Sequence, residues 1–186
     1  MKAGSIDAAF NMDKGEIHFP IYPFPATAPR HIAVSDIVEV IDWFPPALRL
    51  KDDELLLVSR GQLDELTIFC ERHNIEFVRR YDAWSDLLEP FLDTELTFSA
   101  RKGIYARLTK AGFSKEEVRA IRKKVSRRMW QWTYATWEWQ HYGLYDFWEA
   151  TKPRWFQNAR KWRNLYSWSM EIAIRGIEGD QQEESV

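Results

Sequence analysis

The sequence predicts a mainly α protein: one globular domain of about six or seven helices, with a proline-rich extended N-terminal arm and at most a small strand. Two observations predict this class. After residue 35, apolar residues recur mostly at three- and four-residue spacing, which is the helical period. Serine, glycine, asparagine and proline stand at the ends of these periodic segments, where such residues start or stop helices.

Three regions are expected along the chain. Residues 1–34 form the arm, because their four prolines cannot occupy a helix interior and alternate with aromatic residues. Residues 35–175 form the helical domain. Residues 176–186 are acidic and polar, and we expect a disordered tail there.

The first helix is expected over residues 35–44. Ser35 is placed to cap it, and the dipeptide Pro45-Pro46 stops it. The short apolar run at residues 55–58 fits either a strand or a helix.

The middle of the chain predicts three further elements. A helix over residues 63–73 ends at Asn74, a residue type that favours a helix C-terminus. Residues 75–78 are consistent with a short strand, and residues 84–91 with a helix that Pro90 breaks or restarts.

The strongest local signal is a capping box with a hydrophobic staple at residues 113–118. The Ser114 side chain is expected to accept a hydrogen bond from the backbone N–H of Glu117, and the Glu117 side chain to accept one from the backbone N–H of Ser114. Phe113 is expected to pack on Val118 as the staple. This box follows a helix at about residues 99–111 that Gly112 closes. It should start one long helix over residues 114–142, and a last helix should run over about residues 153–175.

Charge is separated along the chain, although the net charge is only −2. Counting Lys and Arg against Asp and Glu, the net charge is −9 for residues 1–100, +11 for residues 101–175 and −4 for residues 176–186. Such separation is typical either of a nucleic-acid surface or of complementary protein surfaces.

The cysteine content and the hydropathy of the sequence indicate where in the cell the protein is expected. The single cysteine, Cys70, cannot form an internal disulfide, and the N-terminus lacks the pattern of a signal peptide, so we expect a cytoplasmic protein. No apolar stretch is long enough for a membrane span.

The long helix is predicted to have two faces: an apolar one that packs in the core, and a second one on the opposite side. Eight of the ten tryptophans lie between Trp130 and Trp168, and a basic segment leads up to the first of them. Placed at 100° steps, basic and then aromatic residues share one side of the helix. The predicted binding face consists of Arg119, Lys123, Arg127, Trp130, Tyr134 and Trp137.

These observations favour a tryptophan-rich, non-enzymatic protein that binds an acidic protein surface, or a second copy of itself, through this face. Arginine and tryptophan dominate the energetics of protein interfaces. The alternative is nucleic-acid binding. It would use either a helix-turn-helix-like corner at residues 108–121 or stacking of single-stranded bases on the rings of residues 130–137.

An enzyme is the third alternative, and the sequence leans against it. Asp82, Asp86, Glu89 and Asp93 recur at helical spacing and could act as paired acids, although such a run is usually a solvated helix face. The four histidines are scattered, with no pair at metal-ligand spacing in the sequence, and no nucleotide-binding loop is present. We therefore expect no cofactor, no metal and no catalytic residue.

Overall fold

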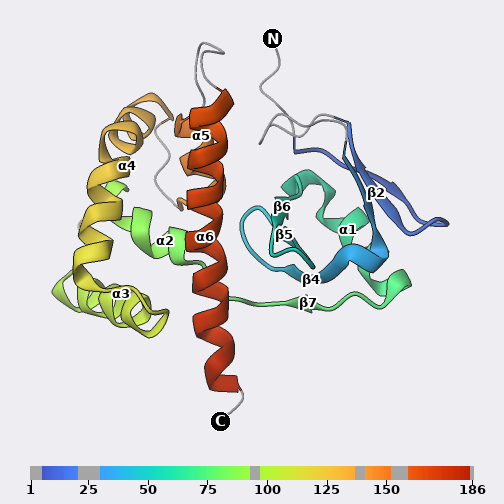
Figure 1. Ribbon diagram of the computed structural model, residues 1–186, viewed down its shortest axis with the longest axis horizontal. Helices are drawn as coiled ribbons and strands as arrows, with labels where there is room; N and C mark the ends of the chain where they lie inside the picture. Colours follow the sequence, from blue (N-terminus) through green and yellow to red (C-terminus); the bar gives the residue numbers. More distant parts are fainter. Residues whose placement is uncertain (1–5, 21–29, 93–96, 137–140, 152–158, 185–186) are drawn as a thin grey trace. The chain divides into compact units, whose positions relative to one another are not determined.

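A computed structural model of the chain describes residues 6–20, 30–92, 97–136, 141–151 and 159–184. Within these residues the chain forms seven β-strands in two sheets and six α-helices (Figure 1). The prediction of a mainly α fold with at most a small strand is therefore wrong, and the fold is mixed α/β. The chain divides into two compact units, Met1–Arg80 with Asn158–Met170, and Tyr81–Gln157 with Glu171–Val186.

The first unit begins with a three-stranded antiparallel sheet of β1 (Ala9–Asn11), β2 (Glu16–Phe19) and β3 (Arg30–Ala33), with β2 in the centre. Ile17, Phe19 and Ile32 are buried on one of its faces. The extended arm predicted for residues 1–34 thus contains three paired strands. Three of its prolines lie in 21–29, outside the described residues.

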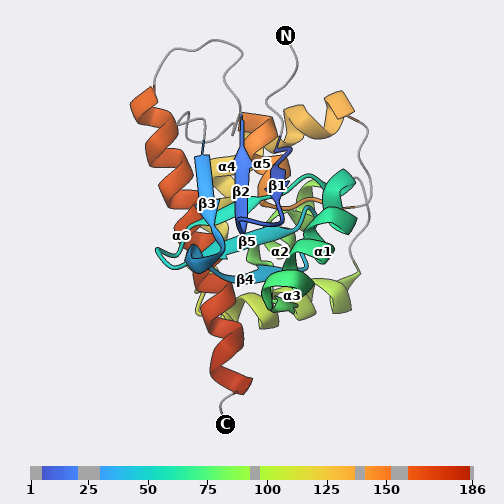
Figure 2. The same ribbon diagram turned by 90° about the vertical axis from the view of Figure 1, so that its right-hand side faces the viewer.

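The second sheet has the strand order β6-β5-β4-β7, in which β4 and β7 are parallel and the other pairs antiparallel. Its strands cross the direction of β1–β3 (Figure 2). Their bounds are Ile37–Ile41 for β4, Ala47–Leu50 for β5, Leu55–Leu57 for β6 and Phe77–Val78 for β7.

The helix predicted over residues 35–44 is wrong: a 3₁₀ turn, Val34–Asp36, leads into β4. Ile37, Glu39, Val40 and Ile41 are all buried, and the register shifts between Ile37 and Glu39. A strand that is buried on both faces and interrupted by a bulge does not alternate in the sequence, so its apolar spacing resembles that of a helix.

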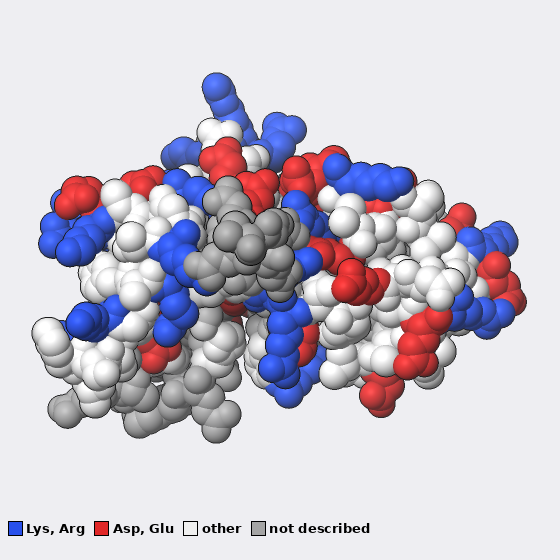
Figure 3. Space-filling view, turned by 90° about the horizontal axis from the view of Figure 1, so that it is seen from below, with Lys and Arg blue, Asp and Glu red and all other residues white. Residues whose placement is uncertain are grey.

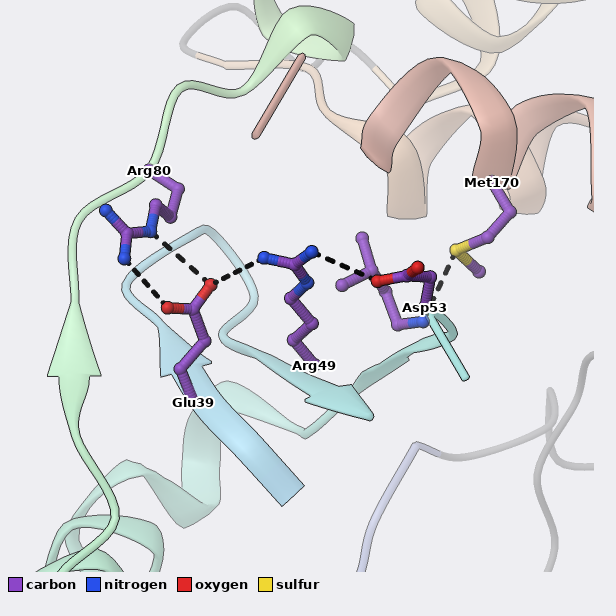
Figure 4. Close-up of polar contacts among 6 residues, drawn as sticks. Glu39, Arg49, Asp53, Arg80 and Met170 are labelled. Atoms are coloured by element: carbon purple, nitrogen blue, oxygen red, sulfur yellow. Dashed lines mark hydrogen bonds and ion pairs between the residues drawn. The ribbon is translucent and has the colours of Figure 1, made fainter. Parts of the chain in front are cut away.

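A charged network links β4 and β5 to the segments beside them (Figure 4). The carboxylate of the buried Glu39 accepts from Arg80 at 2.9 Å and from Arg49 at 3.5 Å, and Arg49 also donates to Asp53 at 3.0 Å. Buried charges are tolerated when they are paired in this way, so we assign the network a structural role.

Helix α1 (Leu63–His73) confirms the helix predicted over residues 63–73. Asn74 ends it in the left-handed conformation, with φ 55°, and β7 confirms the short strand predicted at residues 75–78. The ring of Phe69 on α1 packs against that of Phe10 on β1, with centroids 5.7 Å apart.

The last helix, α6 (Ala159–Glu184), contributes its first part to this unit and its second part to the other. Tyr166 donates to Glu54 at 2.7 Å, and the Glu54 carboxylate also binds the Arg30 guanidinium through two contacts of 2.6 Å. The helix predicted at about residues 153–175 continues to Glu184, over most of the segment predicted as a tail, while 152–158 lie outside the described residues.

The second unit is helical. It contains α2 (Ala83–Leu88), α3 (Phe98–Lys110), α4 (Lys115–Thr136), α5 (Leu144–Thr151) and the second part of α6. A 3₁₀ turn, Glu89–Phe91, follows α2 at the predicted break. In the core, Trp84 of α2 stacks on Phe147 of α5 with ring centroids 4.7 Å apart. The sequence did not predict α5.

Candidate macromolecule-binding face

Helix α4 begins with the predicted capping box, which the structure confirms. The backbone N–H of Glu117 donates to Ser114 Oγ at 3.1 Å, and the N–H of Ser114 donates to Glu117 Oε2 at 2.8 Å. Arg175 of α6 donates to the other Glu117 oxygen at 3.1 Å. The backbone N–H of Ser114, followed by Arg175, lowers the pKa of Glu117, so the box stays ionised and closed.

One side of α4 packs into the helical unit. Val118, Ile121, Val125 and Met129 are buried there at helical spacing. Arg122 also turns inward, and burial lowers its pKa. Its guanidinium donates to the carbonyl oxygens of Asp86 at 3.0 Å and Leu87 at 3.2 Å and to the Tyr105 hydroxyl at 3.2 Å.

The opposite side of α4 is exposed. Trp130 is 41% exposed and Tyr134 is 77% exposed, and the basic residues before them in the predicted face are exposed as well. Trp137 lies outside the described residues. We call the five exposed members of the predicted face the α4 face: Arg119, Lys123, Arg127, Trp130 and Tyr134.

The α4 face is positively charged. Between Val118 and Thr136 the sequence contains no acidic residue. Arg119 lies 3.8 Å from Glu116, and both side chains are exposed, so water and salt screen this contact strongly. Acidic and basic side chains are interspersed on the molecular face drawn in Figure 3, whereas the three charged members of the α4 face are all basic.

The aromatic end of the α4 face is held by neighbouring rings. Trp130 meets the buried Phe91 edge to face, with centroids 5.6 Å apart and planes at 83°. Tyr134 lies beside Trp130, with centroids 6.3 Å apart. A ring that is supported on one edge and exposed elsewhere loses little conformational freedom when a partner covers it.

The corner between α3 and α4 has the hydrophobic arrangement expected of residues 108–121. Leu108, Phe113, Val118 and Ile121 are buried around Gly112, which adopts φ 81°. DNA readout by this corner is less well supported. Arg122 uses its donors inside the protein, and the exposed Glu116 stands at the helix tip that would approach phosphates.

Asp86, a buried member of the predicted acidic series, has its partners inside the protein. Its carboxylate accepts from the Tyr81 hydroxyl at 2.6 Å and from Arg107 at 2.6 and 2.8 Å. The hydrogen bond to Asp86 raises the pKa of Arg107, and burial together with the same carboxylate raises the pKa of Tyr81. These contacts are typical of a structural ion pair.

The other two described acids of the series, Asp82 and Glu89, lie at the two ends of α2. Asp82 caps α2 by accepting from the backbone N–H groups of Trp84 at 2.9 Å and Ser85 at 3.2 Å. Glu89 is half-buried at the end of α2, its pKa raised by burial and by the charge of Asp86, and Asp93 lies outside the described residues. Over the part of the chain that the structure describes, no three acidic, histidine or cysteine side chains are grouped to hold a metal ion.

Cys70 is buried in α1, and burial raises the pKa of its thiol to about 11. The thiolate, which is the reactive form, is therefore disfavoured at neutral pH. Cys70 therefore packs as a small buried side chain of the core.

Comparison with known proteins found no family that matches the chain, no curated protein that is similar to it and no solved structure that resembles it. Among the described helices, none is both long enough and apolar enough to cross a membrane. The geometry of the α4 face is therefore the main guide to function.

Proposed function

We propose that this chain is a non-enzymatic binding protein, acting in the cytoplasm, whose α4 face docks on an acidic protein surface. The observation that carries the proposal is the exposure of Trp130 and Tyr134 at the end of a row of cations. Single exposed apolar residues are ordinary. Two supported rings in line with three cations form a patch of the composition found at interface hot spots.

Each part of the face has a distinct role. Arg119, Lys123 and Arg127 follow one another at four-residue spacing, so their side chains are spaced by about 6 Å along the helix axis. Long-range attraction by such a row accelerates encounter with an acidic partner. Trp130 and Tyr134 then lose water from their rings on docking, which stabilises the bound state.

The acidic partner surface could belong to another protein or to a second copy of this chain. Residues 1–100 carry the excess of acidic groups that such a copy would offer. Light scattering of the purified chain distinguishes the two: a monomer assigns the face to another protein, and a salt-sensitive dimer assigns it to self-association.

Nucleic acid is the second candidate partner, because the same cations and exposed rings could follow a phosphate backbone and stack on single-stranded bases. The inward-turned Arg122 and the exposed Glu116 weigh against duplex recognition at the α4 tip.

A binding experiment tests the proposal with defined acidic probes. Fluorescent poly-glutamate and a single-stranded oligonucleotide are titrated against the wild type and against Arg119→Glu/Lys123→Glu/Arg127→Glu. A matched control, Lys51→Glu/Arg101→Glu/Lys102→Glu, reverses three exposed cations outside α4 and reaches the same net charge.

We expect poly-glutamate affinity to fall by about tenfold or more in the α4 variant and by much less in the control. Equal losses in both variants would show that only net charge matters, and would overturn the proposal. A clear preference for the oligonucleotide, sensitive to Tyr134→Ala, would establish the second candidate instead.

A further inference from the structure

The antiparallel pairing of β2 and β3 brings together two histidines that are thirteen positions apart in the sequence. His18 and His31 are direct cross-strand partners, and their rings stack with centroids 4.1 Å apart and planes at 16°. Val34 N–H donates to the Gly15 carbonyl, and hydrogen-bonded pairs alternate along an antiparallel ladder. His18 and His31 therefore form a non-hydrogen-bonded pair, in which the Cα atoms are only about 4.5 Å apart.

The two imidazoles lie on the outer face of this sheet. Ile17 and Ile32, which are their neighbours in the sequence, point to the buried face, so the histidines point the other way. On β1 the residue opposite His18 is Ala9, which places only a methyl group beside the rings. Glu16 is two residues before His18 on the same strand and therefore shares the outer face.

His18 is half-buried, and its Nε2 atom is shielded from solvent without a hydrogen-bond partner among the described residues. Buried polar nitrogens are nearly always paired, so an unpaired one calls for an explanation. His31 is exposed, and its ring can turn about its side-chain torsions. His18 thus offers a shielded nitrogen, and the ring of His31 can turn to place a second nitrogen close to that of His18.

We infer that the His18–His31 pair is a binding site for a divalent transition-metal ion such as Zn²⁺, Ni²⁺ or Cu²⁺. Imidazole nitrogen suits these ions, whereas Mg²⁺ and Ca²⁺ prefer oxygen ligands. A Zn–N bond is about 2.0–2.1 Å long, so the ring of His31 must tilt from its stacked position for both nitrogens to reach one ion. Water and the Glu16 carboxylate are the available ligands for the remaining positions.

The site has two imidazoles and no third ligand already in place, in agreement with the lack of a three-residue metal group among the described residues. We therefore expect an affinity on the order of micromolar and not that of a closed structural zinc site. Its effect on the protein is to link β2 to β3, so that metal binding stabilises the sheet by mass action.

The other two histidines provide internal controls. His73 is already engaged, with Nε2 3.0 Å from the Met12 carbonyl oxygen and its ring packed on Phe69. His141 belongs to the helical unit, is half-buried, and its pKa is lowered by burial. Neither residue shares the outer face of β1–β3.

Calorimetric titration of the full chain with ZnCl₂ near neutral pH tests the inference. The wild type should bind one ion, and its thermal midpoint should rise with added Zn²⁺ but not with Mg²⁺. His31→Gln should weaken binding by about tenfold or more and remove the thermal shift. His141→Gln should leave both unchanged.

Because His31 is exposed, His31→Gln should keep the fold, which circular dichroism verifies without metal. His18→Gln repeats the test from the other strand, and Glu16→Gln shows whether the carboxylate is a third ligand. Zinc affinity that is equal in the wild type, His18→Gln and His31→Gln would overturn the inference. Failure of the wild type to bind zinc at millimolar concentration would do so as well.

Discussion

The indole of Trp130 meets the phenyl ring of Phe91 edge to face, with centroids 5.6 Å apart and planes at 83°, and yet remains 41% exposed. This contact separates two roles of the tryptophans in the helical unit. Trp84 and Trp148 are fully buried and build the core, whereas Trp130 is only supported by it. The proposed interface depends on that difference.

The stability of ring-truncation variants should follow this separation. Tyr134→Ala should change the free energy of unfolding by no more than about 0.5 kcal/mol, because the side chain is 77% exposed. Trp130→Ala should cost about 1 kcal/mol, since one edge contact is lost. Trp84→Ala should cost about 3–5 kcal/mol. Urea unfolding of the three variants measures these values, and a cost for Tyr134→Ala similar to that for Trp84→Ala would place the α4 face in the core.

A glycine on α6, Gly176, lies where this helix packs closely against the start of α2. A Cβ atom added at Gly176 would lie 2.8 Å from the Cβ of Ala83 on α2 and 3.5 Å from the carbonyl oxygen of Tyr81. Gly176→Ala should therefore push the helices apart and cost about 1–3 kcal/mol.

Gly103 on α3 is the matched control for this substitution. An added Cβ there would meet only the end of the Arg107 side chain, at 3.6 Å. Gly103→Ala should stabilise the protein by about 0.5–1 kcal/mol, because alanine favours helix more than glycine does. Unfolding midpoints that shift in the same direction for both variants would contradict the close approach of α6 to α2.

Asp82 should make stability fall as the pH rises. Burial, with the charges of Asp86 and Asp146 adding to it, raises the pKa of Asp82 to about 7, although two backbone N–H groups lower it. The unfolded chain has the ordinary aspartate pKa of about 3.9. The folded state thus holds the proton more tightly, and this contribution is complete below about pH 4 and is lost as the pH rises through 7.

Asp82→Asn isolates this contribution, because asparagine caps a helix as well as aspartate does. Free energies of unfolding of the wild type and the variant, measured across the interval from about pH 4 to pH 8, should differ in slope. The wild type should lose stability relative to the variant as the pH rises. If the two free energies of unfolding change with pH in parallel, folding does not change the pKa of Asp82.

Local signals in the sequence were sufficient for part of the fold. The Ser114–Glu117 capping box and the break at Gly112 determine the start of α4, and Asn74 determines the end of α1. At these positions a few neighbouring residues determine where the helix begins or ends, without contacts from distant parts of the chain.

The sheets could not be predicted in the same way. Strand β4 is buried on both faces and carries a bulge, so its pattern does not alternate, and its pairing with β7 joins residues far apart in the sequence. The His18–His31 pair was missed for the same reason, because only strand register brings these rings together. Helical periodicity did place the residues of the α4 face on one side, but the exposure of Trp130 and Tyr134 required the structure.

Photo-crosslinking from position 134 tests the central claim most directly. A benzoylphenylalanine replaces Tyr134 in cells that express the full chain, and the same group at Phe98, which is 86% exposed on α3, serves as the control. If the chain binds through the α4 face, the group at position 134 should form an adduct with an acidic protein, and the group at position 98 should not. Reversing the charges of Arg119, Lys123 and Arg127 should remove this adduct. No adduct beyond that of the control, or an adduct that survives the charge reversal, would contradict binding through α4.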